Sequence, residues 1–272
     1  MLDQTNRHQK IIELDQKSNY GQHSILFRDE YIDLNSLEVD LDEPIYRIFS
    51  NKRFQQTLKI NELVLVRPEQ WQDPFENILL QCVLKLKDGS LVSLSELRRK
   101  FFGQCWTFRQ ECDGLWRNYK SRRIAIKVKS TPRKIMSALY DLGLKSHASS
   151  FYCGRVEYIP QLNLLNFIKE HPHYFISPGD NANLIRSALF KRESYSYEEE
   201  IRFIYYDIEN RVAGDDYRFS IDINSVFDEI AVDPFITDSQ FRRIERMIRN
   251  KGYTGNVYQS DLYKPIQLVI SF

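Results

Sequence analysis

The sequence has few cysteines, and their spacing fits neither a metal site nor a disulfide framework. Only four occur in 272 residues, with no Cys-x-x-Cys pair and no histidine at ligand spacing. Structural zinc sites need closely spaced Cys and His ligands, and small secreted domains carry many paired cysteines. We therefore predict reduced thiols and no bound metal. The four residues are Cys82, Cys105, Cys112 and Cys153.

Long apolar runs are also missing. No stretch approaches the roughly 20 apolar residues of a membrane-spanning helix, and residues 1–18 are polar, without the basic-then-apolar pattern of a secretion signal. The sequence also lacks a glycine-rich phosphate loop, Gly-x-Ser-x-Gly and His-Glu-x-x-His, which argues against P-loop, α/β-hydrolase and zincin chemistry. We expect a cytoplasmic protein with no membrane partner.

Neither sign of charge dominates the whole chain. Its 38 basic and 37 acidic residues give a net charge of +1, so no global field attracts nucleic acid or membrane. Residues 29–43, however, hold seven acidic residues and no basic one, interleaved with apolar residues. This pattern predicts an amphipathic arm that lies on the protein, and a solvated helix edge explains it equally well. We predict an acidic, amphipathic N-terminal extension over residues 1–43 and a single catalytic domain over residues 44–272.

Helix and strand patterns follow one another without a regular βα period. Alternating apolar residues predict strands at residues 44–50, 62–66 and 103–108. Capping signals and 3.6-residue periodicity predict helices at residues 132–143 and 238–251. Such a mixture is typical of the α+β class, with mixed, mainly antiparallel sheets and flanking helices, and not of a doubly wound sheet.

Residues 190–207 form the stretch around which the rest is organised. Their C-terminal half reads as an apolar strand, on which Glu198, Glu200 and Arg202 would share one face while Glu199 points the other way. A solvated strand end would explain this run of glutamates. Because the run leads directly into residues that must be buried, we expect at least one carboxylate to line a cleft.

Arg47 occupies an unusual position for a permanent charge. It lies in the middle of the predicted strand at residues 44–50, among apolar and aromatic neighbours. An unpaired buried guanidinium costs several kcal/mol, so Arg47 must meet a carboxylate or an anionic ligand. A salt bridge to Glu76 or Glu198 satisfies this need, and so does a phosphate, which the guanidinium fork fits as readily.

One segment carries a local positive field. Residues 117–134 contain eight basic residues and no acidic one, enough to hold a phosphate backbone. A basic strand edge that discourages aggregation explains the segment nearly as well. We predict a nucleic-acid partner, with RNA favoured. The predicted nucleic-acid-binding residues are Arg122, Arg123, Lys127 and Lys129.

Five ordered motifs resemble the bacterial family catalogued as domain of unknown function 2971. The resemblance covers roughly residues 44–258, and the family label itself implies no chemistry. The motifs are Tyr46-Arg47, TrpGlnAspProPheGlu at 71–76, CysTrpThrPhe at 105–108 with Trp116 and Tyr119, ValGluTyr at 156–158, and Lys191 followed by TyrGluGluGluIleArg at 197–202.

The order of these motifs also resembles the ADP-ribosyltransferase fold. The resemblance implies that Arg47 holds the dinucleotide NAD, the substrate, and that Thr107 shapes the nicotinamide pocket. It implies Glu200 as the catalytic carboxylate, with Glu198 positioning or deprotonating the acceptor. We expect an intracellular toxin or phage-defence effector, with a neutralising antitoxin as a possible partner. The aromatic residues that would stack on a ring of NAD are Trp106, Trp116 or Tyr119, although aromatic residues of this kind more often belong to the core.

Two other classes of function stay open. A metal-dependent nuclease would gather carboxylates around magnesium, with Lys191 nearby. A non-catalytic module binding nucleic acid or protein would use the basic segment and leave the glutamates as salt-bridge partners. The carboxylates of the nuclease alternative are Asp73, Glu76, Glu198 and Glu200.

Overall fold

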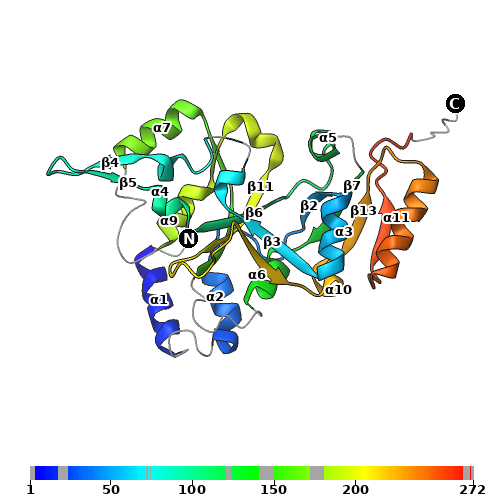
Figure 1. The fold of residues 1–272 in the computed structure, drawn as a ribbon, viewed down its shortest axis with the longest axis horizontal. Coiled ribbons are helices and arrows are strands. Elements are labelled where there is room, and N and C mark those ends of the chain that lie inside the picture. The colour runs from blue at the N-terminus through cyan, green and yellow to red at the C-terminus, as the bar shows by residue number, and fades with distance from the viewer. Residues whose placement is uncertain are drawn as a thin grey trace.

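A computed structural model of the chain describes residues 4–17, 24–71, 73, 75–120, 124–140, 150–171, 181–265 and 270. Within these residues, ten strands form one mixed sheet with helices on both faces (Figure 1). The α+β prediction is therefore confirmed. The strands of this sheet are β1 (Ser36–Leu37), β2 (Ile45–Ser50), β3 (Glu62–Val66), β6 (Phe101–Thr107), β7 (Ala125–Ser130), β8 (Phe151–Arg155), β11 (Glu200–Tyr206), β12 (Asp216–Ser220), β13 (Glu229–Val232) and β14 (Asn256–Gln259).

The other elements flank this sheet. The strand pairs are β4 (Val83–Lys85) with β5 (Leu91–Ser93), and β9 (Glu157–Ile159) with β10 (Phe190–Arg192). The α-helices are α1 (Gln4–Lys17), α2 (Arg28–Leu34), α3 (Asn51–Ile60), α4 (Ser95–Arg98), α5 (Asp113–Lys120), α6 (Pro132–Tyr140), α7 (Gln161–Glu170), α9 (Asn181–Arg186), α10 (Ile223–Val226) and α11 (Asp238–Asn250). The 3-10 helices are η1 (Ser24–Phe27), η2 (Pro68–Gln70), η3 (Ile78–Gln81), η5 (Ser187–Leu189) and η6 (Glu193–Glu198). None of these helices is long and apolar enough to cross a membrane.

The large sheet forks at β6. Strand β11 pairs with β6 along its whole length, from Glu200 opposite Thr107 to Tyr206 opposite Phe101. The other edge of β6 is shared, because β2 pairs at Thr107 and β3 pairs at Gly103. From this fork, one arm continues through β7, β13 and β14, and the other arm ends in β12. The fork leaves an opening between β2 and β3 in the middle of the sheet.

Both faces of the sheet are buried, as the alternation along β11 shows. Ile201, Phe203 and Tyr205 belong to a core that includes residues of α2, α3, α6 and α11. Ile204 and Tyr206 belong to a second core, built with residues of α7 and α9. Side chains repeat with period two along a strand, so Glu200 and Arg202 lie on the face of this second core.

The predicted N-terminal extension packs closely on the rest of the chain. Tyr31 and Ile32 of α2 are fully buried in the larger core, and β1 adds a parallel strand to β8 of the main sheet. Residues 29–43 therefore contribute to the same core as the strands that follow, as their apolar half predicts.

Residues 190–207, which were predicted to end in a strand, form three elements in the structure. They begin with β10, turn through η6 and enter β11 at Glu200. Glu200 and Arg202 share one face of β11, as predicted. Glu198 lies outside the strand, which corrects the prediction that it shares this face, because Glu199 takes a left-handed backbone conformation with φ of 41°. That turn ends η6 and changes the direction of the chain before the strand begins.

Gly103 allows the close approach of an indole ring at the fork. A Cβ atom on Gly103 would lie 2.6 Å from Cζ2 of Trp71, a contact that a rigid ring relieves only by moving. We predict that Gly103→Ala lowers the free energy of unfolding by ~1–3 kcal/mol, the usual cost of overpacking. Gly214→Ala is the control, because no atom lies within 4 Å of its Cβ position. Equal denaturation midpoints for the two variants would contradict this packing argument.

Candidate functional site

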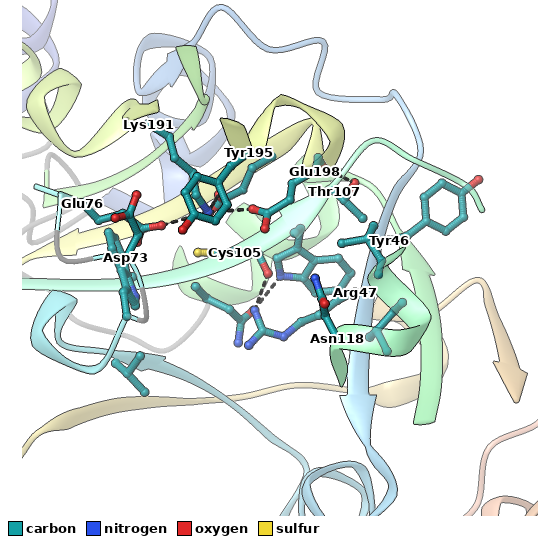
Figure 2. Close-up of a pocket in the computed structure, with 18 of the residues that line it drawn as sticks. Tyr46, Arg47, Asp73, Glu76, Cys105, Thr107, Asn118, Lys191, Tyr195 and Glu198 are labelled. Atoms are coloured by element: carbon teal, nitrogen blue, oxygen red, sulfur yellow. Dashed lines mark hydrogen bonds and ion pairs between the residues drawn. The ribbon is translucent and has the colours of Figure 1, made fainter. Parts of the chain in front are cut away.

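A pocket of about 280 Å³ opens at the fork of the sheet (Figure 2). Its walls come from β2, β3 and β6, from α5, and from the segments around Trp71 and Lys191. Both charged and aromatic side chains line it. The lining residues are Tyr46, Arg47, Ile48, Val66, Gln70, Trp71, Asp73, Glu76, Gly103, Gln104, Cys105, Trp106, Thr107, Leu115, Asn118, Lys191, Tyr195, Glu198 and Glu200.

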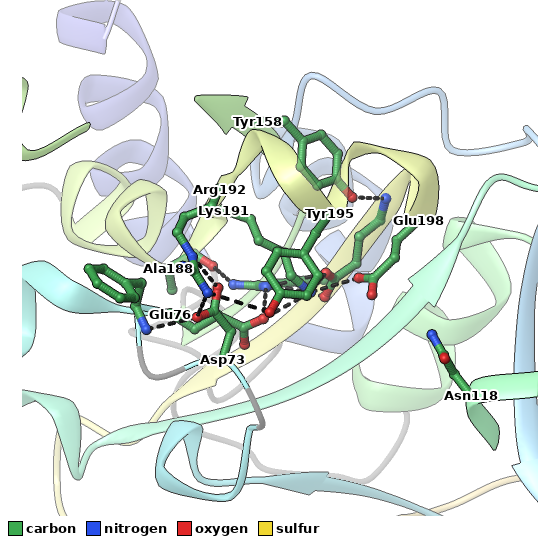
Figure 3. Close-up of polar contacts among 12 residues, drawn as sticks. Asp73, Glu76, Asn118, Tyr158, Ala188, Lys191, Arg192, Tyr195 and Glu198 are labelled. Atoms are coloured by element: carbon green, nitrogen blue, oxygen red, sulfur yellow. Dashed lines mark hydrogen bonds and ion pairs between the residues drawn. The ribbon is translucent and has the colours of Figure 1, made fainter. Parts of the chain in front are cut away.

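Lys191 lies at the centre of a group of three carboxylates on one side of this pocket (Figure 3). Its Nζ atom is 2.6 Å from Oε2 of Glu198, 2.9 Å from Oε1 of Glu76 and 3.0 Å from Oε2 of Glu200. The ring of Tyr195 covers the ammonium group at 4.8 Å. One lysine thus joins Glu76 to the two glutamates at residues 198 and 200.

Arg202 is the second cation of this group. Its side chain is fully buried, and it bonds Glu200 through Nε at 2.8 Å and through the terminal nitrogen Nη2 at 3.2 Å. It also lies 3.3 Å from Glu76 and donates to the carbonyl oxygen of Ala188 at 2.5 Å. The indole of Trp71 stacks over the guanidinium at 4.4 Å. Three carboxylates and two cations give this buried network, Glu76–Lys191–Glu198–Glu200–Arg202, a formal charge of −1.

The two glutamates of the Glu-x-Glu motif differ in environment. Burial alone would raise the pKa of Glu200, but Arg202 and Lys191 outweigh it and lower the pKa to about 2. Burial raises the pKa of Glu198 above its ordinary value, and Lys191 opposes this rise only in part. The side chain of Glu198 is 20% exposed, against 4% for Glu200. Glu198 is therefore the carboxylate that a ligand in the pocket can reach.

The backbone around Glu198 is fixed from several directions. The hydroxyl of Thr107 donates to the carbonyl oxygen of Glu198 at 2.5 Å. The amide of Phe108 donates to the carbonyl oxygen of Glu199 at 2.9 Å, and the Glu199 carboxylate pairs with Arg109 at 2.8 Å. Thr107 is thus part of the pocket wall and also anchors the turn that presents Glu198. This structural role accounts for the position of Thr107 without a direct contact between its side chain and a ligand.

Arg47 lies beside the opening of the fork and links β2 to β6. It projects from β2, and its Nη1 atom donates to the carbonyl oxygen of Cys105 on β6 at 2.5 Å. Its guanidinium also lies 5.2 Å from the ring of Phe49. The ion pairs described above for Glu76 and Glu198 run to Lys191 and Arg202. Arg47 is therefore a pocket-wall residue, across the opening from the glutamates (Figure 2).

The structure separates the three aromatic residues predicted to stack on NAD. Trp106 lines the pocket but is 2% exposed, and its indole N–H donates to Gln104. Trp116 is 1% exposed, donates to Glu111 and does not line the pocket. The side chain of Tyr119 lies outside the described residues. Trp71 and Tyr195 are the aromatic side chains that flank the charged network, and the TrpGlnAspProPheGlu turn and the SerTyrSerTyr segment before the glutamates were the available signals for them.

The basic segment does not present an open basic face at Lys127. This side chain is 4% exposed, forms an ion pair with Glu111 and lies near the ring of Trp116. The prediction that Lys127 contacts nucleic acid is corrected here, because α5 covers this part of β7. Lys129 is partly exposed and lies 3.7 Å from Glu229. Arg122 and Arg123 lie outside the described residues.

The carboxylates of the nuclease alternative are engaged by cations. Arg192 binds Asp73 through two nitrogen atoms at 2.7 and 3.2 Å, and Lys191 occupies the space between Glu76, Glu198 and Glu200. In the part of the chain that the structure describes, no group of three or more His, Cys, Asp or Glu residues is arranged to hold a metal ion. This carboxylate set is thus organised around side-chain cations.

No protein-family model and no curated protein matches the chain, so the resemblance to domain of unknown function 2971 stays a prediction. Among solved structures, it is similar to DarT from Thermus sp. 2.9 in complex with NAD+, at 14% identity and a TM-score of 0.35 over 80% of this chain and 95% of that one. A DarT complex with ADP-ribosylated ssDNA gives 12% identity and a TM-score of 0.36 over 80% and 94%. Scores of this size do not establish a common fold.

We predict that replacing Glu200 lowers the free energy of unfolding more than replacing Glu198 does. Glu200→Gln leaves Lys191 and Arg202 short of a buried partner, which costs about 3–5 kcal/mol of unfolding free energy. Glu198→Gln costs less than about 1 kcal/mol, because Lys191 keeps two carboxylates and Glu198 is partly exposed. Denaturant unfolding of both variants measures the difference, and equal losses would show that the network has no such asymmetry.

Proposed function

We propose that the protein is an NAD-dependent ADP-ribosyltransferase whose acceptor is a nucleic acid. One observation carries this proposal. The resemblance to ADP-ribosyltransferases selects Arg47, Thr107, Glu198 and Glu200 from three distant parts of the sequence, and all four line one pocket. An arginine, a threonine and a Glu-x-Glu motif thus meet at one opening. This convergence indicates that they serve one site or one structural network.

The walls of the pocket suit the parts of a dinucleotide. The guanidinium of Arg47, on the far wall from the glutamates, would bind the pyrophosphate, for which its planar fork is well shaped. Trp71, Tyr195 and the edge of Trp106 offer apolar surface to the nicotinamide ring. A volume of about 280 Å³ lies at the lower end of the range for small-molecule sites, so the pocket would enclose the nicotinamide riboside end and leave the adenosine end more open.

The reaction requires a carboxylate close to the ribose. The N-glycosidic bond breaks, nicotinamide leaves with the bonding electron pair, and positive charge develops on the ribose. A nucleophilic oxygen or nitrogen of the acceptor then forms the new bond to C1′ and loses its proton to a base. An ionised glutamate facing the pocket can stabilise the charge and accept the proton. Its electrostatic effect is larger where the bound substrate displaces water from the pocket.

We propose that Glu198 carries both of these roles, whereas the resemblance implied Glu200 as the catalytic carboxylate and gave Glu198 only the acceptor and its proton. Glu200 is held on both oxygens by Arg202 and Lys191, so it anchors the network and keeps Lys191 in place. Glu198 makes one ion pair, faces the pocket and has a raised pKa. These are properties of a carboxylate that meets substrate and exchanges a proton.

We propose RNA as the nucleic acid that accepts the ADP-ribose. It was predicted from the basic segment, of which Lys127 is buried and Lys129 is near Glu229. An enzyme that consumes NAD and modifies nucleic acid inside the cell would act as a toxin or phage-defence effector, with an antitoxin protein as its natural regulator. Incubation with labelled NAD and separate pools of RNA, ssDNA and protein tests the class of acceptor directly.

We predict that Glu198→Gln lowers the rate of NAD consumption by about 100-fold or more, the range for removal of one preorganised electrostatic group. Glu199→Gln is a matched control in the same turn, because its exposed ion pair with Arg109 contributes little and the backbone bonds of the turn remain. It should retain activity. Full activity of a folded Glu198→Gln variant would refute the role of Glu198, and absence of any NAD consumption or labelled acceptor would refute the proposed function.

The pH dependence of the reaction follows from the environment of Glu198. Activity needs its ionised form, so kcat/KM should fall as the pH drops through the pKa of Glu198, which burial raises above 4.5. The carboxyl of Glu200, with a pKa of about 2, contributes stability that is present above its ordinary pKa and is lost as the pH falls towards 2. We therefore predict loss of activity at a pH where a melting curve still shows a folded protein. An acid limb at or below pH 4.5 would contradict this.

A further inference from the structure

The exposed aromatic side chains of this protein gather around one short helix. Among the residues that the structure describes, three aromatic side chains are well exposed: Tyr197 at 38%, Phe235 at 38% and Tyr263 at 44%. They come from η6, from the segment after β13 and from the segment after β14. Exposed aromatic groups that gather in this way from distant parts of a chain usually mark a binding surface.

Each of these rings contacts α5 or its side chains. The side-chain amide of Asn118 donates to the hydroxyl of Tyr197 at 3.2 Å. The hydroxyl of Tyr263 donates to Asp113, and the guanidinium of Arg117 lies 5.5 Å from the ring of Phe235. The rings of Phe235 and Tyr263 lie 4.5 Å apart. These contacts hold the rings in place while one part of each stays open to solvent.

This surface is continuous with the pocket. Leu115 and Asn118 of α5 line the pocket, and Arg117 on the outer side of the same helix is 61% exposed. Arg117 pairs with Asp113 at 2.7 Å, and both side chains are well exposed, where such a pair contributes little. The surface thus combines exposed rings with the guanidinium of Arg117 near the mouth of the pocket.

We infer that the outer face of α5, with Tyr197, Phe235 and Tyr263, binds single-stranded nucleic acid and delivers it to the pocket. Unpaired bases stack on exposed aromatic rings, and arginine contacts the backbone phosphates. A base held on Tyr197 lies next to Asn118, at the edge of the pocket that contains Glu198. This inference rests on the proposed function, because it names the path by which the acceptor reaches that site.

If bases stack on these rings, removal of the rings should weaken binding only to oligonucleotides that carry bases. The combined variant Tyr197→Ala, Phe235→Ala and Tyr263→Ala should raise the dissociation constant for a fluorescent 12-nucleotide ssDNA or RNA at least about tenfold, the effect of losing one stacked base. An abasic oligonucleotide of the same length keeps the phosphates. Wild type and the variant should bind it equally. Fluorescence anisotropy measures all of these complexes.

Two control variants make the result specific. Tyr197→Phe with Tyr263→Phe keeps both rings but removes their hydroxyl contacts with Asn118 and Asp113. It should recover most of the affinity that the triple alanine variant loses, because stacking needs the ring and not the hydroxyl. Leu162→Ala, which removes an exposed apolar side chain from α7, should leave binding unchanged. Equal affinity of wild type and the triple alanine variant overturns the inference, and so does an equal loss on the abasic strand, which would indicate phosphate contacts alone.

Failure of this inference is distinguishable from failure of the proposed function. If wild type binds NAD in calorimetry but binds neither ssDNA nor RNA, and labelled NAD modifies a protein, the inference is wrong while the transferase activity stands. If wild type binds oligonucleotides through these rings but neither binds nor consumes NAD, the proposed function is wrong and the surface belongs to a binding module. Comparison of the ssDNA and RNA dissociation constants identifies which nucleic acid is preferred.

Discussion

The buried interaction of Glu200 with Arg202 and Lys191 is the constraint on which the rest of the site depends. A guanidinium and an ammonium group cannot stay in this interior without anionic partners, because desolvation of each costs several kcal/mol. Glu200 and Glu76 each pair with both cations, and Glu198 pairs with Lys191. The segment near Trp71, the strand β10 and the strand β11 are therefore tied to one another by charge. The position of Glu198 follows, since Lys191 is its partner.

The forked sheet turns this network into a site. A continuous sheet would have covered the edge of β6 with a single neighbouring strand. Here β2 and β3 each pair with one end of β6, and the opening between them exposes backbone and side chains of residues 103–107 to the pocket. Arg47 bonds the carbonyl oxygen of Cys105 beside that opening, so a buried edge has a polar partner where no strand is present.

Sequence patterns predicted the elements of this site better than their contacts. The strands that carry Arg47, Thr107 and Glu200 were predictable from apolar alternation, because that pattern depends only on nearby residues. The turn at Glu199 was not predictable, since a left-handed backbone at a glutamate has no local signal. The burial of Lys127 was also missed, because it depends on α5 packing over β7, a contact between distant segments. The fork was not predictable either, because local patterns do not determine which strands pair with each other.

The helix α5 is only eight residues long, and two of its faces have different contacts. Leu115 and Asn118 face the pocket, while Asp113 and Arg117 hold the aromatic rings outside. Whatever a ligand on the outer face does to the affinity of the pocket, a ligand in the pocket does to the outer face by the same factor, because thermodynamic coupling is reciprocal. The order in which two substrates bind would then change the kinetics of assembly, but not the stability of the ternary complex.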